Sequence, residues 1–179
     1  KERNLSSMAL VFNGEPLLFD TPEHVQQQLM KAKVSYMKIQ TVFISHFHAD
    51  HFIGIIGLLA TMTLHERPEA LTIFGPRKVK EKVMQGIELG GFRPRFQILC
   101  KEAREGVIIE NEAYSVRAVR VEHSTPCWGY VFEEKGKKAF FDKPKALALG
   151  IPEGPLYAKL QRGETVKWNG KTFKPAQVL

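Results

Sequence analysis

The chain has 179 residues, of which 44% are hydrophobic and 25% charged, and its formal net charge is +7. This size and composition are those of one soluble globular domain with a sizeable core, and the positive charge favours anionic partners such as nucleic acid. Two cysteines, Cys100 and Cys127, are too few for a disulfide framework. The longest apolar stretch, residues 52–62, is too short to cross a bilayer, so we expect a cytoplasmic protein without a membrane segment.

The first elements predicted along the chain are a β-hairpin and a helix. Two apolar runs, residues 8–12 and 17–19, flank Asn13-Gly14, a sequence typical of a type I′ hairpin turn. Thr21-Pro22 suits a helix cap followed by a first helical residue, so we expect the helix to begin there.

Helices and strands then alternate, and strands dominate afterwards. Helices are predicted at residues 53–64 and 76–87. Strands are predicted at residues 41–45, 71–74, 96–99, 107–109, 114–121 and 128–132. This order is typical of an α/β sandwich with a mixed sheet.

The pattern changes at residue 143, where prolines and glycines interrupt regular structure and lysines become frequent. We interpret residues 143–175 as an arm that leaves the domain formed by residues 1–142. It should contain a short helix at residues 157–160 and a hairpin around Asn169-Gly170. The alternative is an ordinary surface loop with solvated charges.

Three imidazoles and a carboxylate lie within residues 46–51, directly after the predicted strand 41–45. Polar groups are costly to bury without partners, and neutral imidazole and carboxylate groups suit zinc and similar divalent ions. In an extended segment His46 and His48 point to the same side and can reach one ion. Asp50 and His51, at the turn into the next helix, can face a second. Asp50 could instead cap that helix, but capping does not account for three histidines.

The spacing His46-x-His48-x-Asp50-His51 matches the HxHxDH signature of the metallo-β-lactamase superfamily. Other segments resemble one branch of it, the RNase Z family of tRNA 3′-processing endonucleases. In chain order these segments are Lys1-Glu2-Arg3-Asn4, Leu18-Phe19-Asp20 with Glu23 and Gln26, Gly75-Pro76, Val121-Glu122-His123-Ser124 with Gly129-Tyr130, and residues 149–155 with Gly154-Pro155. The first motif identifies only the superfamily, whereas the segment with Gly154-Pro155 points to RNase Z. The resemblance implies a partial αββα sandwich, its N-terminal half, with an extruded flexible arm.

The sequence departs from the family pattern at two places. Thr21-Pro22-Glu23-His24 stands where family members have Cys-Gly-Glu-Gly, so the local backbone should differ. The family's second half supplies a metal-bridging aspartate in a GDT motif and a final histidine, and neither occurs here. We therefore expect the chain to be a fragment, or the ordered part, of a longer protein.

The resemblance also implies roles for individual residues. His46, His48 and His123 would hold one zinc ion, and Asp50 and His51 would contribute to a second. Asp50 would be the general base. Contacts to RNA would come from Lys1, Arg3, Asn4, Gly154, Pro155, Lys159 and Arg162.

The function implied by the resemblance is zinc-dependent cleavage of precursor tRNA at its 3′ end. It also implies a homodimer, in which the arm of one subunit holds RNA for the site of the other. One alternative is a phosphodiesterase of the same fold acting on small esters. Another is a catalytically inactive fragment that binds RNA or dimerises.

Overall fold

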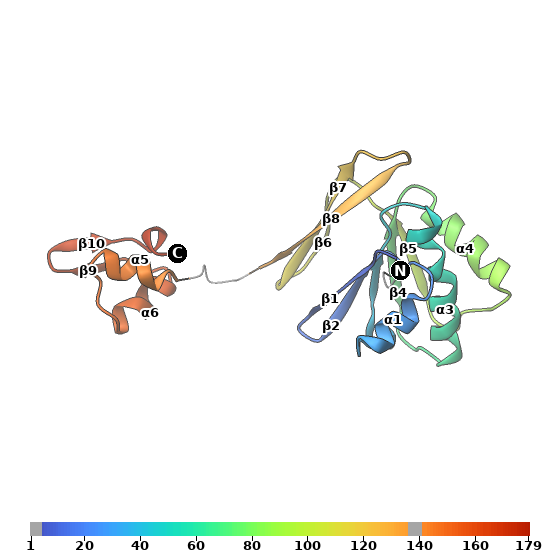
Figure 1. The fold of residues 1–179 in the computed structure, drawn as a ribbon, viewed down its shortest axis with the longest axis horizontal. Helices are drawn as coiled ribbons and strands as arrows, with labels where there is room; N and C mark the ends of the chain where they lie inside the picture. The colour runs from blue at the N-terminus through green and yellow to red at the C-terminus, as the bar shows by residue number, and fades with distance from the viewer. Residues whose placement is uncertain (1–4, 136–140) are drawn as a thin grey trace. The chain divides into compact units, whose positions relative to one another are not determined.

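The computed structural model describes residues 5–135 and 141–179. The chain divides into two compact units, Lys1–Glu133 and Glu134–Leu179, whose described residues are drawn from blue to light orange and from orange to red in Figure 1. Three residues that the family resemblance assigns to RNA binding lie outside the described residues: Lys1, Arg3 and Asn4.

The first unit is built on a five-stranded sheet with the strand order β1-β2-β3-β4-β5. Its strands are β1 (Met8–Phe12), β2 (Glu15–Phe19), β3 (Thr41–Phe43), β4 (Leu71–Gly75) and β5 (Ile98–Glu102). β1 and β2 pair antiparallel, and the remaining neighbours pair parallel. Asn13 and Gly14 have φ angles of 49° and 83°, as a type I′ turn requires, so the predicted hairpin is confirmed.

Helices cover one face of this sheet, as Figure 1 shows. They are α1 (Val25–Lys31), α2 (Ala49–Phe52), α3 (Gly54–Leu64) and α4 (Val79–Gly90), with a short 3-10 helix η1 (Tyr36–Lys38). Val42 and Ile73 of the sheet and Leu58 of α3 are fully buried in the core between these layers. No helix within the described residues is both long and apolar enough to cross a membrane.

A second sheet, with the order β6-β7-β8, covers the other face. Its strands are β6 (Gly106–Glu110), β7 (Tyr114–Val121) and β8 (Cys127–Glu134). Phe43 and Phe74 of the first sheet and Val116 of β7 form the buried contact between the two sheets. The layers are therefore helix, sheet and sheet, which is the partial α/β sandwich predicted from the sequence.

Two predicted helix starts are wrong by three residues. Thr21 does not cap α1. Its side chain is fully buried, and its hydroxyl donates to the carbonyl of Phe52 at 3.2 Å. The helix begins only at Val25, after His24 in the left-handed region with φ 62°. In the same way α4 begins at Val79 rather than at Pro76, after Lys78 with φ 72°.

The second unit has a hydrophobic core of its own, within which Ala146, Ile151, Leu160 and Val178 are fully buried. Its elements are α5 (Lys143–Ala148), α6 (Pro155–Gln161), β9 (Val166–Trp168), β10 (Lys171–Phe173) and the 3-10 helix η2 (Pro175–Gln177). The predicted short helix and the hairpin at Asn169-Gly170 are both present. Because the segment has a packed core, the alternative of an ordinary surface loop is wrong.

Candidate metal centre

The histidine cluster lies at the carboxyl end of β3, where the chain leaves the sheet before α2. Two hydrogen bonds from β8 hold this loop in place. The Tyr130 hydroxyl donates to the carbonyl of Ile44 at 2.8 Å, and the backbone N–H of Trp128 donates to the carbonyl of Ser45 at 3.0 Å. The second sheet therefore holds the backbone that directly precedes His46.

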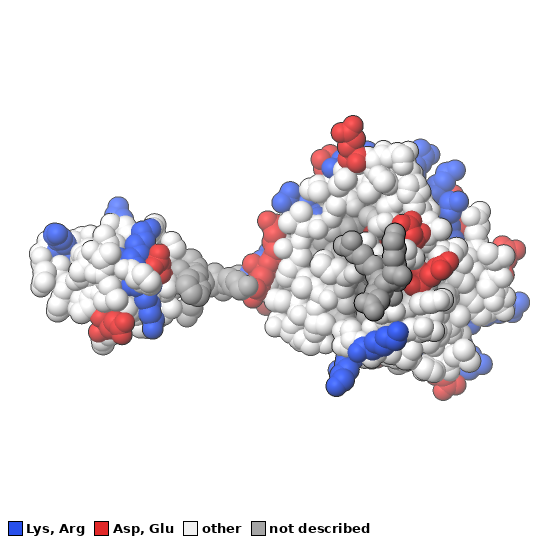
Figure 2. All heavy atoms as spheres, in the orientation of Figure 1, with Lys and Arg blue, Asp and Glu red and all other residues white. Residues whose placement is uncertain are grey.

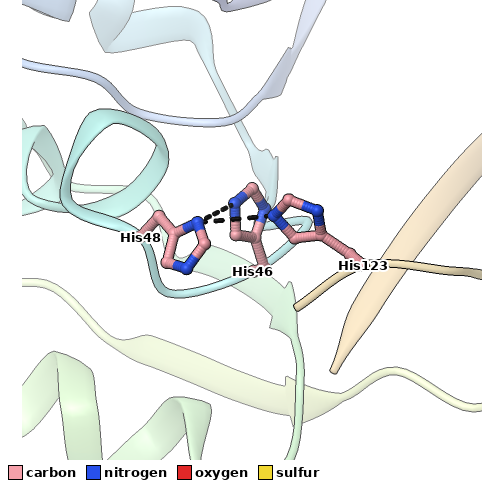
Figure 3. A group of neighbouring side chains, drawn as sticks. All are labelled: His46, His48 and His123. Atoms are coloured by element: carbon pink, nitrogen blue, oxygen red, sulfur yellow. Dashed lines mark hydrogen bonds between the residues drawn. The ribbon is translucent and has the colours of Figure 1, made fainter. Parts of the chain in front are cut away.

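The structure brings His46, His48 and His123 together, although His123 is far away in the sequence (Figure 3). His46 Nε2 lies 3.1 Å from His48 Nδ1, and His123 Nε2 lies 3.4 Å from the same atom. A tetrahedral zinc ion with bonds of about 2.05 Å holds its ligand atoms about 3.3 Å apart. Two of the three nitrogen separations match this value, and all three nitrogens lie within 4.8 Å of one another, so the group can hold one divalent ion.

Asp50 and His51 lie next to this group as a pair. His51 Nε2 is 3.7 Å from Asp50 Oδ2, and the centroids of the His46 and His51 rings are 4.3 Å apart. The pair offers one nitrogen and one carboxylate oxygen to a neighbouring position. The assignment of Asp50 and His51 to a second ion stays a prediction.

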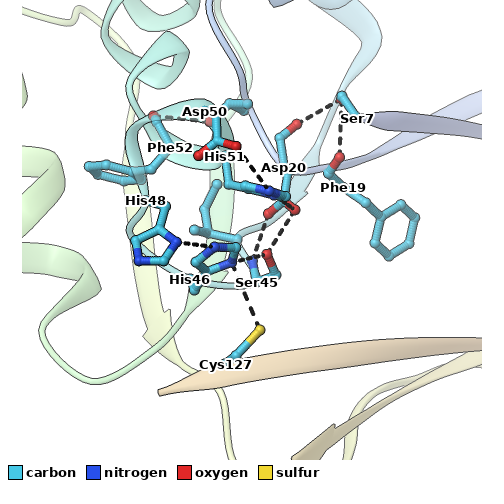
Figure 4. A network of polar contacts seen from close by, with 12 residues as sticks. Ser7, Phe19, Asp20, Ser45, His46, His48, Asp50, His51, Phe52 and Cys127 are labelled. Carbon is cyan, nitrogen blue, oxygen red and sulfur yellow. Dashed lines mark hydrogen bonds and ion pairs between the residues drawn. The ribbon is translucent and has the colours of Figure 1, made fainter. Parts of the chain in front are cut away.

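Asp20 is a member of the site that sequence reasoning did not select (Figure 4). Its carboxylate accepts hydrogen bonds from the backbone N–H and the hydroxyl of Ser45 at 2.7 and 2.8 Å, and contacts His51 Nδ1 at 2.7 Å. A signal for it existed, because Asp20 follows β2 and β2 pairs in parallel with β3. The carboxyl ends of parallel neighbours meet at one edge of a sheet, where ligands bind.

The environment of His46 favours the neutral imidazole. Burial and then the neighbouring His51, His48 and His123 lower the pKa of His46, and Asp20 only partly opposes this. A metal needs the neutral ring as its ligand. The Cys127 thiol lies 3.8 Å from His46 Nδ1, on the side of the ring away from the converging nitrogens, and burial raises its pKa.

The residues predicted to contact RNA in the second unit gather at α6. Gly154 precedes the helix with φ 144°, and Pro155 is its first residue. Lys159 is exposed on the helix, and Arg162 directly follows it. The Arg162 guanidinium is already engaged, because its Nε donates to Glu164 Oε1 at 2.8 Å.

A family model described as Anti-Pycsar protein Apyc1 matches residues 1–141. The chain belongs to this family. Proteins named Ribonuclease Z are also similar to it over its whole length. The chain is 42% identical to the one from Methanosarcina acetivorans, covering 100% of this chain and 59% of the relative. It is 39% identical to the one from Archaeoglobus fulgidus, covering 99% of this chain and 58% of the relative.

Solved structures show the same fold. The crystal structure of human tRNase Z, short form, matches with a TM-score of 0.66 and 29% identity, covering 75% of this chain and 60% of the other. The metallo-β-lactamase fold protein YhfI from Bacillus subtilis matches with a TM-score of 0.57 and 18% identity, covering 73% and 51%. These matches confirm the predicted fold class, and the relatives confirm the resemblance to RNase Z.

The chain spans less than two thirds of the length of the curated relatives it matches. It covers 59% of the relative from Methanosarcina acetivorans. Together, the metallo-β-lactamase fold and the three converging histidines indicate a metal-binding site.

Proposed function

We propose that the chain is part of a zinc-dependent endoribonuclease of the RNase Z type, which removes the 3′ trailer from precursor tRNA in the cytoplasm. One observation carries this proposal: three imidazole nitrogens converge within 4.8 Å at the carboxyl edge of the sheet. The name and 42% identity of the Methanosarcina acetivorans relative support the choice of substrate.

In this proposal His46, His48 and His123 hold one zinc ion, and Asp50 and His51 contribute to a second. Bound divalent ions lower the pKa of water and stabilise negative charge on the attacking and leaving oxygens. Asp50 then accepts the proton of the attacking water. Its side chain is 54% exposed, so both water and a phosphate group can reach it.

The second unit is proposed to bind the RNA, with residues 143–175 as the arm. Its described residues carry more basic than acidic side chains, and Figure 2 shows several of the basic ones on its visible face. Lys159, Arg162 and the Gly154-Pro155 start of α6 would contact the phosphate backbone. Lys1, Arg3 and Asn4 would contact RNA at the cleavage point. We further propose a homodimer, in which each arm serves the partner's site.

The metal centre is tested by zinc content. The purified chain should retain zinc after dialysis, and the double variant His46→Ala, His48→Ala should lose it, because two of the three converging nitrogens are removed. His24→Asn is the matched control. It removes an exposed imidazole outside the cluster, and asparagine tolerates the left-handed backbone found there. Unchanged zinc in the double variant would contradict the proposed centre.

The substrate is tested separately, because the family model and the curated relatives carry different names. The zinc-loaded full-length protein of which this chain is part should cleave precursor tRNA directly after the discriminator base and leave a 3′-hydroxyl. Hydrolysis of a chromogenic phosphodiester with precursor tRNA left intact would support the phosphodiesterase alternative. Binding of precursor tRNA without either reaction would support the inactive RNA-binding alternative.

A further inference from the structure

We propose that Asp20 and Ser45 set the proton positions of two histidines, so that each presents its Nε2 lone pair to a metal. Asp20 acts on His51 directly and on His46 through the Ser45 hydroxyl. This inference rests on the proposed metal centre. It concerns positioning residues that contact the ligands, and neither is itself offered as a ligand.

The first step is the direct contact of Asp20. Its Oδ2 atom lies 2.7 Å from His51 Nδ1, with both side chains largely shielded from solvent at 15% and 24% exposure. An ionised carboxylate can only accept hydrogen bonds, so His51 Nδ1 must carry the proton and donate it. The lone pair of His51 is then on Nε2, the atom that faces Asp50.

The second step runs through Ser45. Its hydroxyl donates to Asp20 Oδ2 at 2.8 Å, and its oxygen lies 2.9 Å from His46 Nδ1. A hydroxyl has one proton, which is already committed to the carboxylate. The oxygen must therefore accept from His46 Nδ1–H, which leaves the lone pair of His46 on Nε2. That atom points toward His48, 3.1 Å away.

The backbone holds Asp20 where these contacts are possible. Its own N–H donates to the carbonyl of Phe43 at 2.8 Å, and its carbonyl accepts from the Ser7 hydroxyl at 2.9 Å. Asp20 also adopts φ 58°, a left-handed conformation that few residues other than Gly, Asn and Asp adopt readily. One carboxylate is thereby fixed beside ligands of both proposed metal positions.

The test measures zinc affinity by competition with a chromogenic chelator. Ser45→Ala breaks only the branch to His46 and should weaken zinc binding about 10–100-fold, as outer-shell substitutions do. Asp20→Asn should weaken it at least as much, because an amide cannot accept at both of its ends. Asparagine is the suitable replacement, since it tolerates the left-handed backbone.

Two controls separate positioning from general damage to the fold. Ser45→Thr keeps the hydroxyl and should retain the wild-type zinc affinity. Ser7→Ala removes a bond to the Asp20 carbonyl but none to its carboxylate, and it should also bind zinc normally. Folded Ser45→Ala or Asp20→Asn protein with wild-type affinity would overturn the proposal.

The proton positions can be observed directly in zinc-free protein by long-range ¹H–¹⁵N NMR of the imidazole rings. Wild-type His46 and His51 should both carry the proton on Nδ1. Ser45→Ala should change the pattern of His46 alone, and Asp20→Asn should change both. If the wild-type chain binds no zinc, the proposed function fails, whereas a wild-type His46 or His51 protonated on Nε2 would refute this inference.

Discussion

At the scale of single residues, the proposed metal ligands were easier to predict than the residues that hold them in position. His46 and His48 are two residues apart, so the geometry of an extended segment predicts that they lie on one side. Asp20 was missed because its partners Ser45 and His51 are 25 and 31 residues away in the sequence. Only the pairing of β2 with β3 brings them together. The role of His123 likewise rested on family resemblance, because a histidine in a loop has no periodicity to mark it.

Cys100 provides a prediction at this scale. Burial raises the pKa of the Cys100 thiol to about 11, and nearby Lys80 opposes this only partly. Below that pH the protonated thiol dominates, and only the thiolate reacts with iodoacetamide. At pH 8 we expect alkylation roughly 100-fold slower than for a free thiol of ordinary pKa, with the rate rising as the pH approaches 11. Peptide mass spectrometry with N-acetylcysteine as reference measures this, and equal rates at pH 8 would contradict it.

At the scale of elements, the strands and the hairpin turn could be predicted because they depend on local signals. The start of α1 could not. The Thr21 hydroxyl and carbonyl are used by Phe52 and Gly54, which lie in distant segments, so this stretch packs against α2 and α3 and cannot start the helix. A tertiary contact of this kind overrides a local capping signal.

Gly54 tests the contact between α3 and this stretch. A Cβ atom on Gly54 would lie 1.8 Å from the carbonyl oxygen of Pro22 and 2.8 Å from that of Thr21. Because both neighbours are backbone, Gly54→Ala should lower the free energy of unfolding by about 3 kcal/mol. It should also weaken zinc binding, since the displaced segment continues from Asp20. Urea denaturation and chelator competition measure the two effects.

Gly57 is the matched control in the same helix. A Cβ atom there would approach only the end of the flexible Gln26 side chain, at 3.0 Å. Gly57→Ala should therefore be near neutral or stabilising by about 0.5–1 kcal/mol, the usual gain within a helix. Equal losses of unfolding free energy in the two variants would contradict the role given to the close contact at Gly54.

At the scale of the whole molecule, the proposed metal centre belongs to the first unit, whereas the proposed arm that binds RNA belongs to the second. The composition change predicted a second segment from residue 143, whereas the second compact unit begins at Glu134. Its packed core was not predictable, since prolines and glycines obscure the periodicity that marks buried positions. Trp168, 40% exposed, shows that not every large apolar side chain there joins the core.

Lys159 and Arg162 test this separation of roles. Replacing both with alanine should weaken precursor tRNA binding about 10-fold and reduce the salt dependence, because each phosphate contact contributes close to one unit of slope. Zinc affinity should not change. The control is Lys80→Ala with Lys82→Ala, two exposed lysines on α4. Equal weakening of tRNA binding by both pairs would indicate only non-specific attraction to positive charge.

The placement of His123 has a mechanical consequence. His46 and His48 follow a strand of the five-stranded sheet, whereas His123 lies in the connection between β7 and β8 of the other sheet. An ion held by all three would cross-link the two sheets at one edge, next to the hydrogen bond from the Tyr130 hydroxyl to the carbonyl of Ile44. Removing the ion with a chelator would then do more than abolish catalysis. It would also weaken the contact between the two sheets and lower the melting temperature of the first unit.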